Sequence, residues 1–204
     1  MSKRLAGRCG YQLDNPFSVT LHEDKLEDPL HWRKPQKVFV CSMGDLFHED
    51  VPTSYIARMW NIMSGCRDHT FQVLTKRPER LLAILENAGE YEGWITHNGR
   101  PPASYTIHSP GIVMGTADQW PLPNVWVGVT AENQKRTEER IPVLTRIPAA
   151  LRFVSIEPML GFIDLQDHLP GINWVICGGE TGPGARALHP NWVRDLKGQC
   201  FQHR

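Results

Sequence analysis

Five short apolar runs are spaced along the chain, and each is followed at once by polar, charged or glycine residues. Together with the polar residues that follow them, the runs cover residues 38–45, 71–77, 125–132, 153–157 and 174–180. Nearly continuous β-branched and aromatic residues are typical of parallel strands that are buried on both faces. The pattern therefore predicts five parallel strands, each with a polar carboxyl end.

Helical patterns separate these apolar runs. Pro52 and Pro78 each stand where a helix would begin, with apolar residues at helical spacing behind them. Further helices are expected to start near Asn133 and after His189. Strands that alternate with helices indicate an α/β protein with crossover helices. We expect one domain over residues 1–204, folded as a partial (β/α) barrel.

One connection is much longer than the others. Residues 90–124 are rich in glycine, proline and aromatic residues, and the segment far exceeds the typical loop of about five residues. It is either a lid over a site or an inserted excursion with its own small core, and the sequence leaves both readings open.

The composition narrows the function classes. The chain has 204 residues, 41% of them hydrophobic, and its 22 basic residues balance its 22 acidic residues. A formal net charge of zero argues against binding to nucleic acid by bulk electrostatics, although a local basic patch stays possible. No apolar stretch is long enough for a membrane span, and no signal core follows the N-terminal charges, so we expect a cytoplasmic protein.

Cysteine and histidine spacing predicts no metal site. The five cysteines are scattered without a C-x-x-C pair, and the nine histidines form no close pair, so neither a zinc site nor a disulfide framework is indicated. Cys41 and Cys177 lie inside apolar runs, and we expect both to be small core residues.

Charged residues at the strand ends are the candidate site. In parallel folds the ligand sits where the carboxyl ends of the strands open into loops, so these residues should converge on one mouth. The candidates for catalysis are Lys76, Glu132, Glu157 and Glu180. Asp45 and Arg77 belong to the same set, although Asp45 could simply cap a turn. The alternative for the whole set is unrelated structural salt bridges.

The glycine-rich loop 178–186 follows the last strand and precedes a helix. Backbone N–H groups of Gly178 and Gly179 could approach an anion there, and Arg186 could add a planar donor for carboxylate or phosphate. Lys76 or Arg77 could hold an anionic substrate group in the same way. The loop lacks Walker and Rossmann spacing, and a tight turn at a barrel rim explains it equally simply.

Seven segments, taken in order, resemble the phage and bacterial gene-product thirty-seven/sixty-eight family, a domain of unknown function. They are residues 14–17, 32–35, 42–48, 74–78, 125–130, 155–161 and 178–182. Members of that family resemble radical S-adenosylmethionine enzymes, in which three closely spaced cysteines after the first strand of a partial barrel hold a [4Fe–4S] cluster. The resemblance implies that Ser42, Gly44 and Asp45 occupy the place where such enzymes bind the methionine part of the cofactor.

The resemblance also implies truncation at both ends, because residues 1–8 correspond to the helix after the cysteine segment and Arg204 lies inside the last helix. We therefore expect S-adenosylmethionine and a [4Fe–4S] cluster only in full-length relatives. For this chain we expect no cofactor and no redox activity, and whether it is an enzyme stays open.

Two alternatives remain: a non-redox barrel that binds or hydrolyses a small molecule or phosphate with its strand-end carboxylates, and an inert fragment of a phage gene. The substrate is an unknown small molecule. The loss of flanking strands would leave residues 38–41 and 174–177 as exposed edges, which predicts self-association through strand edges.

Overall fold

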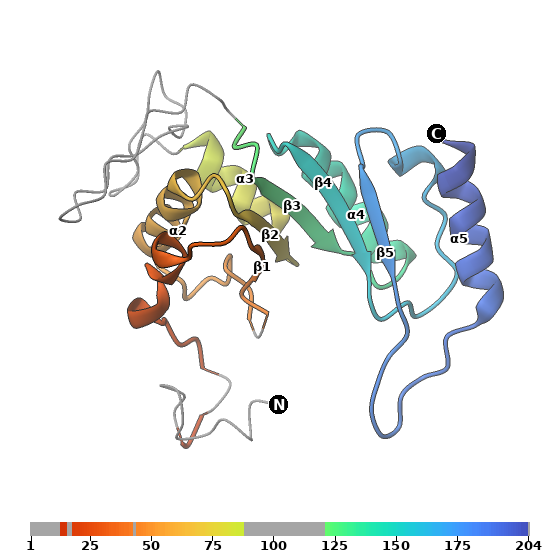
Figure 1. Ribbon diagram of the computed structural model, residues 1–204. Coiled ribbons are helices and arrows are strands. Elements are labelled where there is room, and N and C mark those ends of the chain that lie inside the picture. The colour runs from red at the N-terminus through yellow and green to blue at the C-terminus, as the bar shows by residue number, and fades with distance from the viewer. Residues whose placement is uncertain (1–12, 16–17, 43, 88–120, 204) are drawn as a thin grey trace.

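The computed structural model describes residues 13–15, 18–42, 44–87 and 121–203 (Figure 1). Most of the long connection at 90–124, interpreted as a lid or an inserted excursion, lies outside the described residues. No helix in the described ranges is long and apolar enough to cross a membrane.

Five parallel strands form one sheet, and their order across the sheet follows the chain. The strands are β1 (Lys37–Val40), β2 (Thr70–Thr75), β3 (Val125–Thr130), β4 (Leu151–Ile156) and β5 (Trp174–Cys177). The predicted α/β architecture with a five-stranded parallel sheet is confirmed. Within the described residues β1 and β5 are the two edges of the sheet, so closure into a barrel stays a prediction.

The helices form where the sequence pattern places them. They are α2 (Thr53–Gly65), α3 (Pro78–Glu86), α4 (Gln134–Arg146) and α5 (Pro190–Gln202), with short 3₁₀ helices η1 (Glu23–Lys25), η2 (Asp28–His31) and η4 (Gln166–His168). Pro78 occupies the first turn of α3, where its missing N–H costs nothing. Asn133 caps α4 by accepting a hydrogen bond from the backbone N–H of Arg136 at 3.0 Å.

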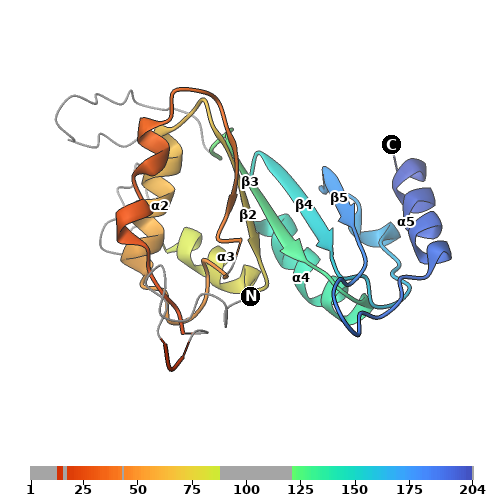
Figure 2. The ribbon, with the colours of Figure 1, turned by 60° about the horizontal axis from the view of Figure 1, so that its bottom comes forward.

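Helices cover one face of the sheet, and no helix in the described ranges covers the other. Figures 1 and 2 show α3 and α4 against the same face, as right-handed crossovers in a sequential sheet require. Val73, Val127 and Val154 lie on this covered face and are at most 1% exposed. We call the opposite side the open face. Two of its aromatic residues, Phe39 and Trp174, are 44% and 41% exposed.

The strand register builds the open face in layers. Gln72 lies beside Trp126, and Trp126 lies beside Leu151. Two residues further along each strand, the next layer is Leu74, Gly128, Phe153 and Trp174. The layer above contains Thr130, Ser155 and Ile176. The open face therefore changes from aromatic to polar toward the carboxyl ends of the strands, because side chains alternate with a period of two.

Candidate functional site

The carboxyl ends of all five strands meet at one edge of the sheet, which we call the rim. Each candidate residue from the sequence follows a strand, so the structure brings the whole set to the rim. Backbone hydrogen bonds tie the neighbouring loops together: Leu160 donates to the carbonyl of Glu132 at 2.9 Å, and Met159 donates to the carbonyl of Gly178 at 2.8 Å. The rim from β3 to β5 is therefore one connected surface.

Asp45 is a fully engaged carboxylate between the loops after β1 and β2. Its Oδ1 accepts from the backbone N–H of Phe47 at 3.0 Å and from the hydroxyl of Thr75 at 2.8 Å. Its Oδ2 accepts from the backbone N–H of Lys76 at 2.9 Å and from Arg77 Nη1 at 3.2 Å. The side chain is only 13% exposed. Asp45 thus caps a turn and joins two strand ends, and it has little capacity left for a ligand.

Glu132 is held between a buried and an exposed cation. Arg140 Nη1 lies 2.8 Å from Glu132 Oε2 and also donates to the carbonyl of Thr130 at 2.7 Å. Lys76 Nζ approaches the other oxygen, Oε1, at 3.9 Å, and the Lys76 side chain is 56% exposed. Arg140 therefore fixes the carboxylate, while Lys76 is free to turn toward a ligand at the rim.

Glu157 is the open carboxylate of the rim. It is exposed, and the hydroxyl of Ser155 donates to its Oε2 at 3.5 Å. A Cβ added at Gly178 would collide with its Oε1, so the carboxylate lies directly against the backbone of the neighbouring loop. Among the described residues, no lysine, arginine or histidine forms an ion pair with Glu157. This carboxylate keeps oxygen lone pairs available for a ligand cation or proton donor.

Glu180 and Arg186 satisfy each other within the loop after β5. Arg186 donates to the Glu180 carboxylate from Nε at 2.7 Å, from Nη2 at 3.0 Å and from its backbone N–H at 3.0 Å. The hydrogen bonds from Arg186 lower the pKa of Glu180 to about 2. Gly182 and Gly184 adopt positive φ angles of 103° and 77°, which glycine permits at a tight turn. The geometry agrees with the interpretation of this loop as a tight turn, because the guanidinium group of Arg186 already donates to Glu180.

The two cysteines at strand ends, Cys41 and Cys177, were expected in the core, and the structure places Cys41 elsewhere. Cys41 is exposed and follows β1 with a φ of 57°, so the prediction that it is a core residue is wrong. The positive φ turns the chain out of the sheet before the thiol can enter the core. Cys177 is half-buried, and burial followed by the Glu157 carboxylate raises the pKa of its thiol. Ser42 and Gly44 are exposed, and a Cβ on Gly44 would meet nothing within 4 Å.

Three aromatic side chains lie below the rim, where the strand ends in the sequence do not point to them. We call Trp126, Phe153 and Trp174 the aromatic layer. The rings of Trp126 and Trp174 have centroids 6.2 Å apart, and those of Phe153 and Trp174 are 5.8 Å apart. The ammonium of Lys37 lies 6.0 Å from the centroid of Trp126. Side chains on one face of a strand recur at every second residue in the sequence. Which residues of different strands lie side by side can be recognised only when the strand register is known.

The described residues do not fit a [4Fe–4S] cluster. The cysteines in the described ranges are Cys41 after β1, Cys66 after α2, Cys177 at the end of β5 and Cys200 in α5. They lie on four separate elements, whereas a cluster needs thiolates that converge. The same ranges contain no group of three His, Cys, Asp or Glu side chains that could hold a metal ion. We derive no chemistry through a cluster.

Comparison with known proteins gives a family without an activity. A family model described as "Protein of unknown function" (DUF5131) matches residues 1–204. No curated protein and no solved structure matches the chain. The match confirms the prediction of a domain of unknown function.

Proposed function

The chain belongs to the DUF5131 family of unknown function, and we propose from its own residues that it binds an elongated small molecule carrying a positive charge. The ligand would lie on the open face with its apolar part on the aromatic layer and its charged end at Glu157. The observation that carries this proposal is the exposed Glu157 carboxylate, without an ion-pair partner among the described residues, above a layer of aromatic rings.

Aromatic faces and a carboxylate favour the same ligand charge. The π-face of tryptophan attracts cations, and Lys37 already lies over Trp126 in this way. Glu132 is neutralised by Arg140 and approached by Lys76, whereas Glu157 is not. An ammonium or sulfonium group would therefore find its counter-charge at Glu157, and Lys76 could contact an anionic group of the same ligand.

The layers of the sheet set the length of the ligand. The exposed Trp174 lies beside Phe153 in the strand register. Phe153 and Glu157 are four residues apart along the chain, so the level of Trp174 lies about 13 Å from Glu157 at roughly 3.3 Å per residue. A flat ring system joined to an amino-acid-like end spans such a distance. A compact ion such as phosphate would contact only one of the two ends.

The resemblance to radical S-adenosylmethionine enzymes supports the same ligand class. S-adenosylmethionine joins a flat base to a sulfonium and an ammonium group, so it is the first compound to test. The parallel sheet in sequential order is compatible with a partial barrel of that kind, and phage origin belongs to the same resemblance. Because the described cysteines do not converge, the proposed role is binding without cluster chemistry.

Titration calorimetry tests the proposal with S-adenosylmethionine, S-adenosylhomocysteine, adenosine and methionine. We expect the cationic, ring-bearing compound to bind best. Replacement Glu157→Gln keeps the shape of the side chain and should weaken binding roughly tenfold, as loss of a charge-assisted hydrogen bond implies. The matched control is Glu139→Gln on α4, where an exposed carboxylate pairs with Arg136 on the surface. Equal affinities of the Glu157 and Glu139 variants, or binding of neutral adenosine as tight as that of S-adenosylmethionine, would contradict the proposal.

A further inference from the structure

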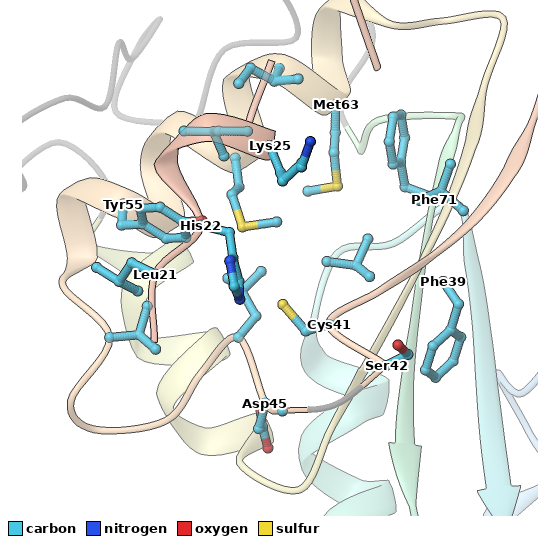
Figure 3. Close-up of a pocket in the computed structure, with 18 of the residues that line it drawn as sticks. Leu21, His22, Lys25, Phe39, Cys41, Ser42, Asp45, Tyr55, Met63 and Phe71 are labelled. Carbon is cyan, nitrogen blue, oxygen red and sulfur yellow. The ribbon is translucent and has the colours of Figure 1, made fainter. Parts of the chain in front are cut away.

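A cavity of about 570 Å³ lies beside β1, away from the aromatic layer of the open face. Figure 3 shows its two walls. The strand side carries Phe39, Cys41 and Phe71, and the other side carries Leu21, His22 and Tyr55. Met59 and Met63 of α2 also line the cavity. The space is therefore a channel between the edge of the sheet and the segment that leads into η1, with mostly apolar walls.

The edge of β1 forms one wall of this cavity, and some of its backbone groups find no strand partner among the residues that the structure describes. The backbone N–H of Thr70 donates to the carbonyl of Gln36 at 2.8 Å. Because successive residues of a strand point their backbone groups to opposite sides, Val38 and Val40 bond to β2, while Lys37 and Phe39 point away from it. Residues 18–22 line the cavity, but within the described ranges they form no backbone hydrogen bond to β1.

The charged groups around the cavity are already engaged. Asp45 accepts four hydrogen bonds from the loop after β1 and from the end of β2, and Asp28 lies 3.7 Å from Lys25 Nζ. Cys41 lines the cavity, and desolvation by the protein atoms around its thiol, followed by the Asp45 charge, raises the thiol pKa to about 11. The thiol is therefore neutral at pH 7, and the backbone edge of β1 adds polar groups to a channel with mostly apolar walls.

We propose that this cavity takes one extended peptide segment of a partner protein, with apolar side chains at alternate positions, as an added strand on β1. Backbone hydrogen bonds to Lys37 and Phe39 would provide affinity, and the apolar pocket formed with α2 would select every second side chain. The inference is independent of the proposed ligand site, because it uses the edge of the sheet rather than the aromatic layer and Glu157.

The dimensions favour a single strand over a second copy of the sheet. A four-residue strand is about 13 Å long, and it occupies about 5 Å across the sheet and 10 Å through it. That volume, about 600 Å³, is of the same order as the cavity. The far wall formed by Leu21 and His22 faces β1 across this space, so edge-to-edge pairing with a whole second domain would meet that wall.

Proline substitutions on the edge strand separate backbone pairing from side-chain contact. Phe39→Pro removes an N–H that faces away from β2, and proline is accepted on edge strands at such positions. The matched control Phe39→Ala removes the ring and keeps the N–H. The pair Lys37→Pro and Lys37→Ala repeats the test at the first residue of the strand, in case Phe39→Pro fails to fold by circular dichroism.

The probes are blocked seven-residue peptides with Val, Ile, Leu or Phe at alternate positions and Thr between them, measured by fluorescence anisotropy. We expect at least one to bind, with the proline variants roughly tenfold weaker than the alanine variants. Binding should also slow hydrogen exchange at the Phe39 amide. Of the two peptides that are N-methylated at alternate residues, one at the even and one at the odd positions, the one whose methylated N–H groups face β1 should not bind, and the other should bind.

Five results would overturn the proposal. The first four are equal binding of the two N-methylated peptides, equal affinities of the proline and alanine variants, no binding by any peptide, and a dimer that Phe39→Pro dissociates. A protected Phe39 amide without peptide that becomes exposed on deletion of residues 1–12 would likewise assign the edge to the chain itself.

Discussion

The two ends of the rim each carry an acidic residue, but the two carboxylates have opposite surroundings. Asp45, after β1, accepts four hydrogen bonds from two loops and is 13% exposed. Glu157, after β4, is exposed and receives one long hydrogen bond, from Ser155 at 3.5 Å. Both stood out in the sequence for the same reason, an acidic residue at the end of an apolar run. The number of donors around each carboxylate separates a structural role from an available one.

The two carboxylates should respond differently to substitution. A buried carboxylate with all its lone pairs used stabilises the fold and resists replacement. A carboxylate with open lone pairs contributes little to stability, because water satisfies it equally well in the unfolded chain. The β1–β2 end of the rim should therefore respond to mutation in stability, and the β4–β5 end in ligand binding.

The sharpest test of this contrast is Asp45→Asn. The amide would turn an NH₂ group toward two of the four donors, so the variant should lose about 2–4 kcal/mol of unfolding free energy. Urea denaturation of both variants measures the difference, with Glu157→Gln expected within about 0.5 kcal/mol of wild type. A loss below about 1 kcal/mol for Asp45→Asn would show that the hydrogen bonds of Asp45 do not stabilise the rim.

Two glycines on the open face extend the comparison. A Cβ at Gly128 would lie 2.5 Å from the ring of Phe153, which is 1% exposed and packed against Trp174. Because that ring cannot move away freely, Gly128→Ala should cost about 1–3 kcal/mol in unfolding free energy.

Gly178→Ala is the matched case. Its Cβ would meet the end of the Glu157 side chain, which is exposed and can swing aside. We expect a stability change below about 1 kcal/mol together with a loss of ligand affinity similar to that of Glu157→Gln. Thermal melting and titration calorimetry on the same samples separate the two effects. A large stability loss in Gly178→Ala would place Glu157 among the structural carboxylates, with Asp45.

Much of the fold was accessible from the sequence because it rests on local signals. The apolar runs correspond to β1–β5, and Pro78 and Asn133 mark the starts of α3 and α4. Barrel closure could not be predicted from such signals, since it depends on pairing between strands that are distant in the chain. Cys41 was misplaced because its positive φ, which takes it out of the strand, leaves no mark in composition.

The candidate site was accessible only as a set of positions. Parallel strands bring their ends together, so the presence of Lys76, Glu132 and Glu157 on one rim follows from the fold class. The ion-pair partners of these residues do not follow from the fold class. Arg140, which fixes Glu132, lies on α4 and does not follow a strand, so its role could not be predicted from the strand ends. The aromatic layer depends on the register between strands, and the cavity at β1 depends on how residues 18–32 pack.

The smallest expected effect on stability concerns the ion pair Glu180–Arg186 in the loop after β5. Arg186 lowers the pKa of Glu180 from 4.5 to about 2. A carboxyl whose pKa is lower in the folded state stabilises the fold above its unfolded pKa, and this contribution is lost as the pH falls through the folded value. Because the pair is exposed and screened, its net contribution to stability should be small.

The pair is therefore best tested by titration rather than by melting. The carboxyl carbon of Glu180, followed by NMR, should titrate near pH 2 in the wild type and close to its ordinary value in Arg186→Gln. The difference in stability between the two proteins should shrink as the pH falls from about 5 to about 2, because protonation removes the acceptor. A wild-type midpoint near the ordinary value would mean that the loop is open in solution. Arg186 would then be free to bind an anion. The loop after β5 would then count, with Glu157, among the parts of the rim that can bind a ligand.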